Sequence, residues 1–234
     1  PTSWSRYDFG TSASLWWAHG RGDGTIWVVG DGGALFALSP DAPGGPTATQ
    51  WPTGLSATAT LYGAWVSPDG VLWAVGGDPK ATTSAADAGV VLRKAPDGPV
   101  ERLALPADVP EDATLFKVWG DGDGRVWVVG EAGVVLRHED DAWHRESVPG
   151  DPRLVTVDGA RLGDDATVTL VAVGGTSQGV VVRRAPDGTW TDGSPPFYPA
   201  LNGVSLAADG RVATGGMLAT AFWRQDGAWD AEGW

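Results

Sequence analysis

The sequence has no cysteine, so disulfide bonds, thiol catalysis and thiolate metal ligands are excluded. Basic residues are also scarce, because 16 Lys and Arg stand against 29 Asp and Glu, giving a formal net charge of −13. Binding to nucleic-acid phosphates or to an anionic membrane surface depends on clustered Lys and Arg, so neither partner is expected. No run of about 18 apolar residues occurs, and membrane insertion is therefore not expected.

Glycine, proline and tryptophan are abundant instead, with 35, 17 and 14 copies in 234 residues. Together with a single methionine, this composition is typical of many short strands joined by tight turns rather than of long helices. A chain of this length fits one large all-β domain.

A repeat runs through the whole chain. Each copy has two apolar strands around an Asp-containing turn, then a Gly-rich turn and two further strands, and the copies begin at Leu15, Leu61, Leu115, Leu154 and Leu201. The glycine that ends the second strand recurs at spacings of 46, 54, 44 and 41 residues, at Gly30, Gly76, Gly130, Gly174 and Gly215. Such spacings are typical of propeller blades. The sequence therefore predicts an all-β fold, a single five-bladed β-propeller of four-stranded antiparallel blades over residues 1–234.

Residues 1–14 precede the first repeat and carry a tryptophan of the fourth-strand type. Trp4 lies 11 residues before Leu15, as Trp143 lies 11 residues before Leu154. We therefore expect residues 1–14 to supply an outer closing strand, with Ser3 to Phe9 pairing with the last blade. The alternative is that the chain is part of a longer propeller.

The turn between the first two strands of most copies contains Asp-Gly, which predicts a type I′ hairpin turn. The third copy has a second acid, Asp121, and raises the question of a calcium loop. Calcium takes six to eight oxygen ligands, and two carboxylates in one short turn supply too few. We interpret the motif as a turn and expect no metal site.

Three further motifs favour structure over catalysis. The segment GTSQG at residues 175–179 matches a nucleophile elbow, but a strand-like VVVRR follows where that motif needs a helix. Asp158 is the one acid on a predicted inner strand, and a glycosidase needs a pair. It aligns with Trp65, Trp119 and His19, and His19 is expected to fill a slot between blades. We predict no catalytic residue and no cofactor, and keep a glycoside hydrolase with a central acidic cleft as a third hypothesis.

The pattern LxxVWG, VWVVG, GVVLR and DDAW resembles the repeats of Ycf48-like and Asp-box (BNR) propellers, and APDGTW at residues 185–190 is the best-preserved box. The units are also similar to tectonin repeats. The resemblance implies a non-catalytic bacterial binding or scaffold module, secreted or in the cell envelope, with a protein or glycan partner. The tectonin similarity implies the alternative, a carbohydrate-binding lectin.

The residues just after each repeat's leucine are expected near the face that carries the turns between second and third strands. Aromatic side chains beside a few polar groups are what a ligand site needs. The candidate ligand-binding residues on this face are Trp16, Trp17, Tyr62, Asp78, Phe116, Glu131, Gln178, Tyr198 and Asn202.

Overall fold

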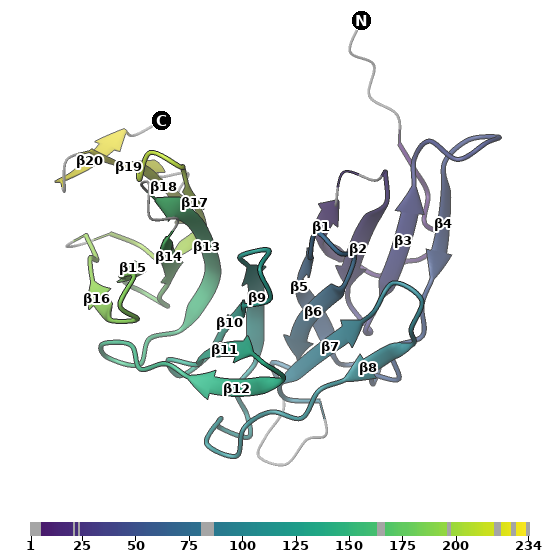
Figure 1. Cartoon of the computed structure of the whole chain (residues 1–234), viewed down its shortest axis with the longest axis horizontal. Coiled ribbons are helices and arrows are strands. Elements are labelled where there is room, and N and C mark those ends of the chain that lie inside the picture. Colours follow the sequence, from purple (N-terminus) through teal and green to yellow (C-terminus); the bar gives the residue numbers. More distant parts are fainter. Residues whose placement is uncertain are drawn as a thin grey trace, which may run out of the picture.

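The computed structural model describes residues 6–20, 22, 24–80, 87–162, 167–195, 198–217, 221–225 and 228–232. These residues form five four-stranded antiparallel sheets, which confirms the predicted propeller blades. Within this part of the chain no helix is long and apolar enough to cross a membrane. Figure 1 shows the sheets side by side in an arc, with the first strand of each sheet on the inside.

The strands follow the repeat. The first blade contains β1 (Leu15–Gly20), β2 (Ile26–Gly30), β3 (Leu35–Ser39) and β4 (Thr47–Gln50). The second contains β5 (Thr60–Val66), β6 (Leu72–Gly77), β7 (Val90–Lys94) and β8 (Val100–Arg102). The third contains β9 (Leu115–Gly120), β10 (Val126–Gly130), β11 (Val135–Glu139) and β12 (Ala142–Arg145). The fourth contains β13 (Leu154–Leu162), β14 (Thr167–Gly174), β15 (Val180–Arg184) and β16 (Trp190–Asp192). The fifth contains β17 (Leu201–Leu206), β18 (Val212–Gly216), β19 (Ala221–Gln225) and β20 (Ala228–Glu232).

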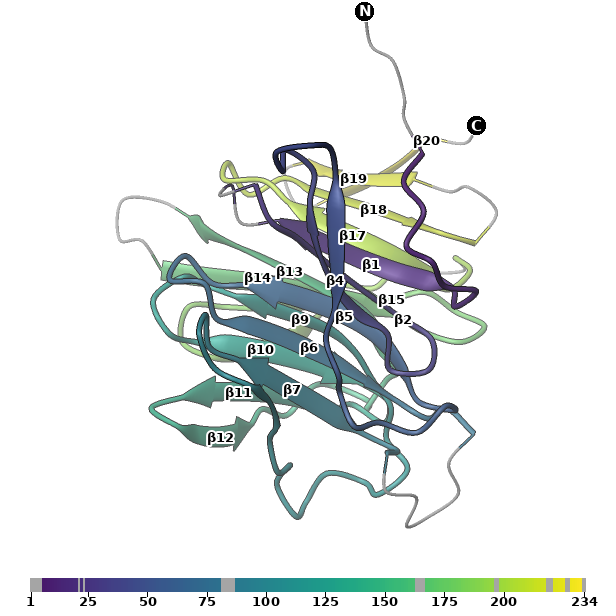
Figure 2. The ribbon, with the colours of Figure 1, turned by 90° about the vertical axis from the view of Figure 1, so that its right-hand side faces the viewer.

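The arc is open between the first and the fifth blade. Neighbouring inner strands pack on each other from β1 through β5, β9 and β13 to β17, but β17 does not pack on β1 in this way. The expected closing strand is absent from the described residues, because residues 6–14 form no strand and β20 is the outer strand of the fifth sheet. Residues 1–5, which include Ser3 and the Trp4 on which this expectation rests, lie outside the described residues. Figure 2 looks onto the first blade and shows residues 6–14 running to β1 without forming a strand.

Phe9 gives this N-terminal segment a different role. Its ring lies 5.3 Å from that of Phe36 on β3, and Tyr7 packs edge-on against Phe9. Phe9 and Ala13 thereby cover a small apolar cluster around Val28 and Phe36. The segment seals a face of its own blade rather than extending the last one.

A β-bulge interrupts every inner strand at the residue after the leucine. In the second blade Leu61 pairs with Gly76 and Gly63 pairs with Val75, which leaves Tyr62 without a partner in the ladder. The glycine is required here, because a Cβ on Gly76 would lie 2.0 Å from the carbonyl oxygen of Thr60. The fifth blade uses Gly216 opposite Leu201, so the repeat glycine predicted at Gly215 is one residue too early.

The Asp-Gly turns differ from the predicted type I′ geometry. In the second blade the Gly70 amide bonds to the Ser67 carbonyl and the Ser67 amide to the Val71 carbonyl, and Gly70 has φ of +91° while Asp69 keeps a negative φ. This is a type I turn followed by a left-handed glycine. Two consecutive positive φ angles occur instead at Asp140 and Asp141, between β11 and β12.

Candidate binding surface on the axial rim

The five bulges direct one side chain per blade toward the same end of the inner strands. A bulge leaves its extra residue outside the ladder and re-aims the side chain. The bulged residues are Trp16, Tyr62, Phe116, Val155 and Asn202. Trp16 donates its indole N–H to Asp31 at 2.6 Å, on the turn between β2 and β3, so this end carries the turns between second and third strands as expected.

Three of these side chains form a continuous aromatic row across the first three blades, which we name the axial rim. The ring centroids of Trp16 and Tyr62 are 6.0 Å apart, and those of Tyr62 and Phe116 are 5.3 Å apart. The Arg153 guanidinium, just before β13, extends the row by lying 4.5 Å from the Phe116 ring centroid. Phe116 is buried, Tyr62 is half-buried and Trp16 is 55% exposed, so the row opens to solvent at Trp16.

Carboxylates line this row. Asp31 accepts hydrogen bonds from Trp16 and, at 3.0 Å, from the Thr60 hydroxyl, and the Trp16 bond is the main reason why the pKa of Asp31 is lowered. Burial raises the pKa of the Tyr62 phenol, and the charges of Asp31 and Asp78 add to the rise. Glu131 accepts a hydrogen bond from Arg153 Nε at 3.0 Å. The rim is thus aromatic with a surplus of negative charge.

Of the nine candidate residues, five lie together at this rim or its edge: Trp16, Tyr62, Phe116, Asp78 and Glu131. The other four lie apart from the row. Gln178 and Asn202 are exposed on the fourth and fifth blades, while Tyr198 packs against the core between those blades. Trp17 points into the axial cavity instead.

That axial cavity, of about 260 Å³, lies among the inner strands and contains a buried lysine. Lys117 on β9 places its ammonium over the Trp17 ring, and burial lowers its pKa to about 7, against a smaller opposing effect of Asp158. A buried ammonium is costly to keep charged, whereas an aromatic face offsets part of that cost. Lys117 could have been noticed in the sequence as the one basic residue in its aligned column.

Two polar residues, two columns further along the inner strands, join neighbouring blades. His19 Nδ1 accepts the Val66 amide N–H at 3.1 Å, which confirms that it fills a slot between blades. Asp158 accepts the Leu206 amide N–H at 2.8 Å and the Gly159 amide N–H at 2.9 Å. Its carboxylate is therefore used in joining the fourth and fifth blades.

Asp121, the additional acid in the third Asp-Gly turn, has a fully buried side chain. Its carboxylate accepts the amide N–H groups of Asp123 and Arg125 and pairs with Arg125 Nε at 2.6 Å. Arg161 on β13 lies 3.7 Å from the same carboxylate. Asp121 thus organises the turn and links the third blade to the fourth.

Comparison with solved structures places this chain among β-propellers. YCF48 bound to D1 peptide superposes with a TM-score of 0.67 at 15% identity, over 94% of this chain and 67% of that one. The WD40 propeller of Doa1 has a TM-score of 0.70 at 9% identity, covering 93% and 68% of the two chains. A mutant of Aleuria aurantia lectin in complex with α-methyl-L-fucoside has a TM-score of 0.52 at 12% identity, covering 94% and 76%.

The chain thus spans about two thirds of the length of the first two propellers. No protein-family model and no curated protein sequence matches it. The likeness to Ycf48 agrees with the resemblance seen in the repeats at the level of fold.

Arg153 is the rim residue that the sequence analysis missed. It precedes Leu154 in the column otherwise occupied by Ser14, Thr60, Thr114 and Ala200. The long basic side chain of Arg153 in a column of small residues could have indicated a special role. Its stacking on Phe116 depends on contact between blades and cannot be derived from one repeat.

Proposed function

We propose that this protein is a non-catalytic binding module whose axial rim captures a polypeptide segment with apolar and basic side chains. The observation that carries the proposal is the row Trp16, Tyr62 and Phe116, which ends in a 55% exposed indole. Monomeric proteins rarely leave tryptophan this exposed, and aromatic residues dominate binding energy at partner surfaces. The peptide complex formed by YCF48 is further support.

Charge supports the basic character of the partner. Asp31, Asp78 and Glu131 lie along the row, with Arg153 paired to Glu131 and Lys80 beside Asp78, and the whole chain carries a net charge of −13. The negative electrostatic field of these carboxylates attracts a basic segment and accelerates its association at low salt.

A display selection tests the proposal. A random peptide library is selected on the wild-type protein, and the enriched peptides are titrated against Trp16→Ala, Tyr62→Ala and Gln178→Ala, with melting temperature recorded for each. We expect Trp16→Ala to weaken binding at least tenfold with an unchanged melting temperature, because the indole is largely exposed. Gln178→Ala, away from the row, is the matched control.

Enriched peptides that bind Trp16→Ala as tightly as wild type would refute the rim as the site. Enrichment of acidic rather than basic peptides would refute its electrostatic part.

The proposal keeps the secreted or cell-envelope location that the family resemblance implies. Fractionation of the producing cells with an antibody against the protein tests this location, and recovery from the cytoplasm alone would contradict it.

A further inference from the structure

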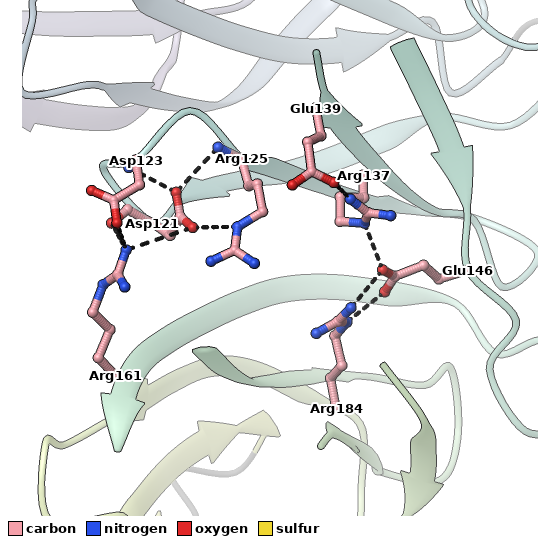
Figure 3. A network of polar contacts seen from close by, with 8 residues as sticks. All are labelled: Asp121, Asp123, Arg125, Arg137, Glu139, Glu146, Arg161 and Arg184. Carbon is pink, nitrogen blue, oxygen red and sulfur yellow. Dashed lines mark hydrogen bonds and ion pairs between the residues drawn. The ribbon is translucent and has the colours of Figure 1, made fainter. Parts of the chain in front are cut away.

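Lys117 differs from other basic residues that lie between the blades. Figure 3 shows Arg137 and Arg184 bound to one carboxylate, with Glu146 oxygens 3.1 and 2.8 Å from their Nε atoms. Lys94 is also buried, and its ammonium donates to two backbone carbonyl oxygens at 2.8 and 3.0 Å. The side-chain nitrogen of Lys117 makes no ion pair and no hydrogen bond within the part of the chain that the structure describes. Its amine is therefore available to a ligand.

The Lys117 amine lies at the axial cavity, although the residue is only 8% exposed. The Trp17 ring covers one side of the amine. Gly63, Thr156 and Gly203 occupy the equivalent positions of the second, fourth and fifth blades, so only Trp17 and Lys117 send long side chains from this column into the cavity. Since Trp17 is 40% exposed, a small molecule can reach the amine by displacing this one indole.

Burial favours the neutral, nucleophilic form of this amine. The other titratable groups among the described residues that line the cavity are His19 and Asp158. His19 Nδ1 accepts the Val66 amide N–H, so the ring is neutral and carries its proton on Nε2. Asp158 opposes the effect of burial only in part, and the pKa of Lys117 is about 7. Near neutral pH much of the amine therefore has a free lone pair, and desolvated lysine amines of this kind form imines with carbonyl compounds.

The walls of the cavity restrict the carbonyl compound. Trp17, Trp65 and Trp119 provide flat apolar surface, which favours an aromatic ring. The Asp158 carboxylate disfavours an anion, and for the same reason it disfavours the carbamate that carbon dioxide would form on Lys117. The volume of about 260 Å³ lies just below the range of about 300–1,000 Å³ that drug-sized ligands occupy, so the ligand is small.

We propose that Lys117 binds a small, neutral aromatic aldehyde in the axial cavity as an imine. The Nζ lone pair forms a bond to the carbonyl carbon while the C=O π electrons move to oxygen, and one amine proton moves to that oxygen. Loss of the hydroxyl group with the second amine proton, as water, leaves a C=N double bond. Addition of water reverses both steps, so the site releases the aldehyde unchanged. The cavity is separate from the axial rim, and the inference stands independently of the proposed peptide binding.

The test uses the fact that the chain has three lysines, Lys80, Lys94 and Lys117. The wild-type protein is treated with benzaldehyde and cyanoborohydride, which reduces an imine to a stable secondary amine, and peptide mapping by mass spectrometry measures the labelling of each lysine. At pH 7 we expect Lys117 to be labelled at least about tenfold faster than exposed Lys80 and hydrogen-bonded Lys94, because a larger share of its amine is neutral. The rate at Lys117 should saturate with benzaldehyde concentration.

Three controls separate a binding site from a merely reactive amine. Benzyl alcohol, which has the ring but no carbonyl group, should protect Lys117 and leave Lys80 unprotected. Anionic 4-formylbenzoate should label Lys117 more slowly than benzaldehyde does, because of Asp158. Lys117→Arg should abolish the fast, saturable label in the intact mass, whereas Lys94→Arg should keep it.

Two outcomes overturn the inference. One is labelling of Lys117 no faster than that of Lys80, which would mean that the amine is inaccessible or charged. The other is a rate at Lys117 that rises linearly with benzaldehyde and is unchanged by benzyl alcohol, which would mean that the cavity does not bind the ring.

Discussion

At the scale of single residues, one inner-strand position joins each blade to the next. The four contacts are His19 to Val66, Trp65 to Gly120, Trp119 to Gly159 and Asp158 to Leu206. Where the side chain is an indole, the residue facing it is glycine. Where it is a short hydrogen-bond acceptor, the residue facing it can be large, since the acceptor reaches only the backbone N–H. The sequence alignment identified the column, but its pairing with the next blade needed the structure.

Gly120→Ala tests this pairing. A Cβ at Gly120 would lie 2.4 Å from the Trp65 ring, so the indole must move, and we expect a loss of about 1–3 kcal/mol in the free energy of unfolding. Urea denaturation measures it. Gly203→Ala is the control, because nothing lies within 4 Å of its Cβ position and alanine should stabilise a strand by up to about 1 kcal/mol. Equal effects of the two changes would contradict the account.

Lys117 gives stability a pH dependence. The pKa of Lys117 falls from 10.5 to about 7 on folding. Between these pH values the unfolded chain binds more protons than the folded chain, so the contribution of Lys117 to the free energy of unfolding rises with pH. Below pH 7 the full penalty applies. We expect Lys117→Met to be more stable than wild type there, by up to about 4 kcal/mol, with the difference shrinking toward pH 10.5. Denaturation across this range measures it, and a gain independent of pH would exclude titration of Lys117 as the cause.

At the scale of strands and turns, the repeat predicted nearly every element, because alternating apolar residues and turn glycines are local signals. The type of turn was predicted wrongly, since Asp-Gly suits both a type I′ turn and a type I turn with a left-handed glycine. The bulges were not predicted either. A bulge adds one residue to the alternation of inward and outward side chains in a short strand. Only the pairing of the first strand with the second shows which residue is the extra one.

Gly76→Ala tests the bulge. The added Cβ would meet backbone atoms, 2.0 Å from Thr60 O and 2.8 Å from Leu61 Cα, and backbone yields less easily than a side chain. We expect a loss of about 3 kcal/mol or more, exceeding that of Gly120→Ala, and weaker peptide binding through displacement of Tyr62. Gly20→Ala, whose Cβ contacts are an ordinary 3.5 and 3.6 Å, should change neither quantity. A mild effect at Gly76 would mean that the bulge tolerates a side chain.

At the scale of the whole molecule, the repeat predicted the number of blades but not the opening of the arc between the first and the fifth blade. Strand count follows from local pattern, whereas the position of residues 6–14 depends on which apolar surface lies nearest. The segment covers Phe36 of the first blade rather than pairing with the fifth. For the same reason the axial rim could be predicted only in part, since stacking of Arg153 on Phe116 arises between blades.

Phe9→Ala tests this covering role. Truncation uncovers Phe36 and should lower the free energy of unfolding by about 1–2 kcal/mol, or the melting temperature by several degrees. Calorimetry measures the shift. Phe9→Leu should keep most of the stability, because an apolar side chain still covers Phe36. If neither change moves the melting temperature, the segment does not stabilise the first blade.

The bulges also assign strand pairing and ligand contact to different residues. A bulged residue takes no part in the ladder, so Trp16, Tyr62, Phe116, Val155 and Asn202 can change while the paired leucines and glycines keep each blade intact. These five positions can therefore differ in side chain from blade to blade while the backbone of the blades stays the same. We therefore expect that recombining their side chains changes what the protein binds without a redesign of its core.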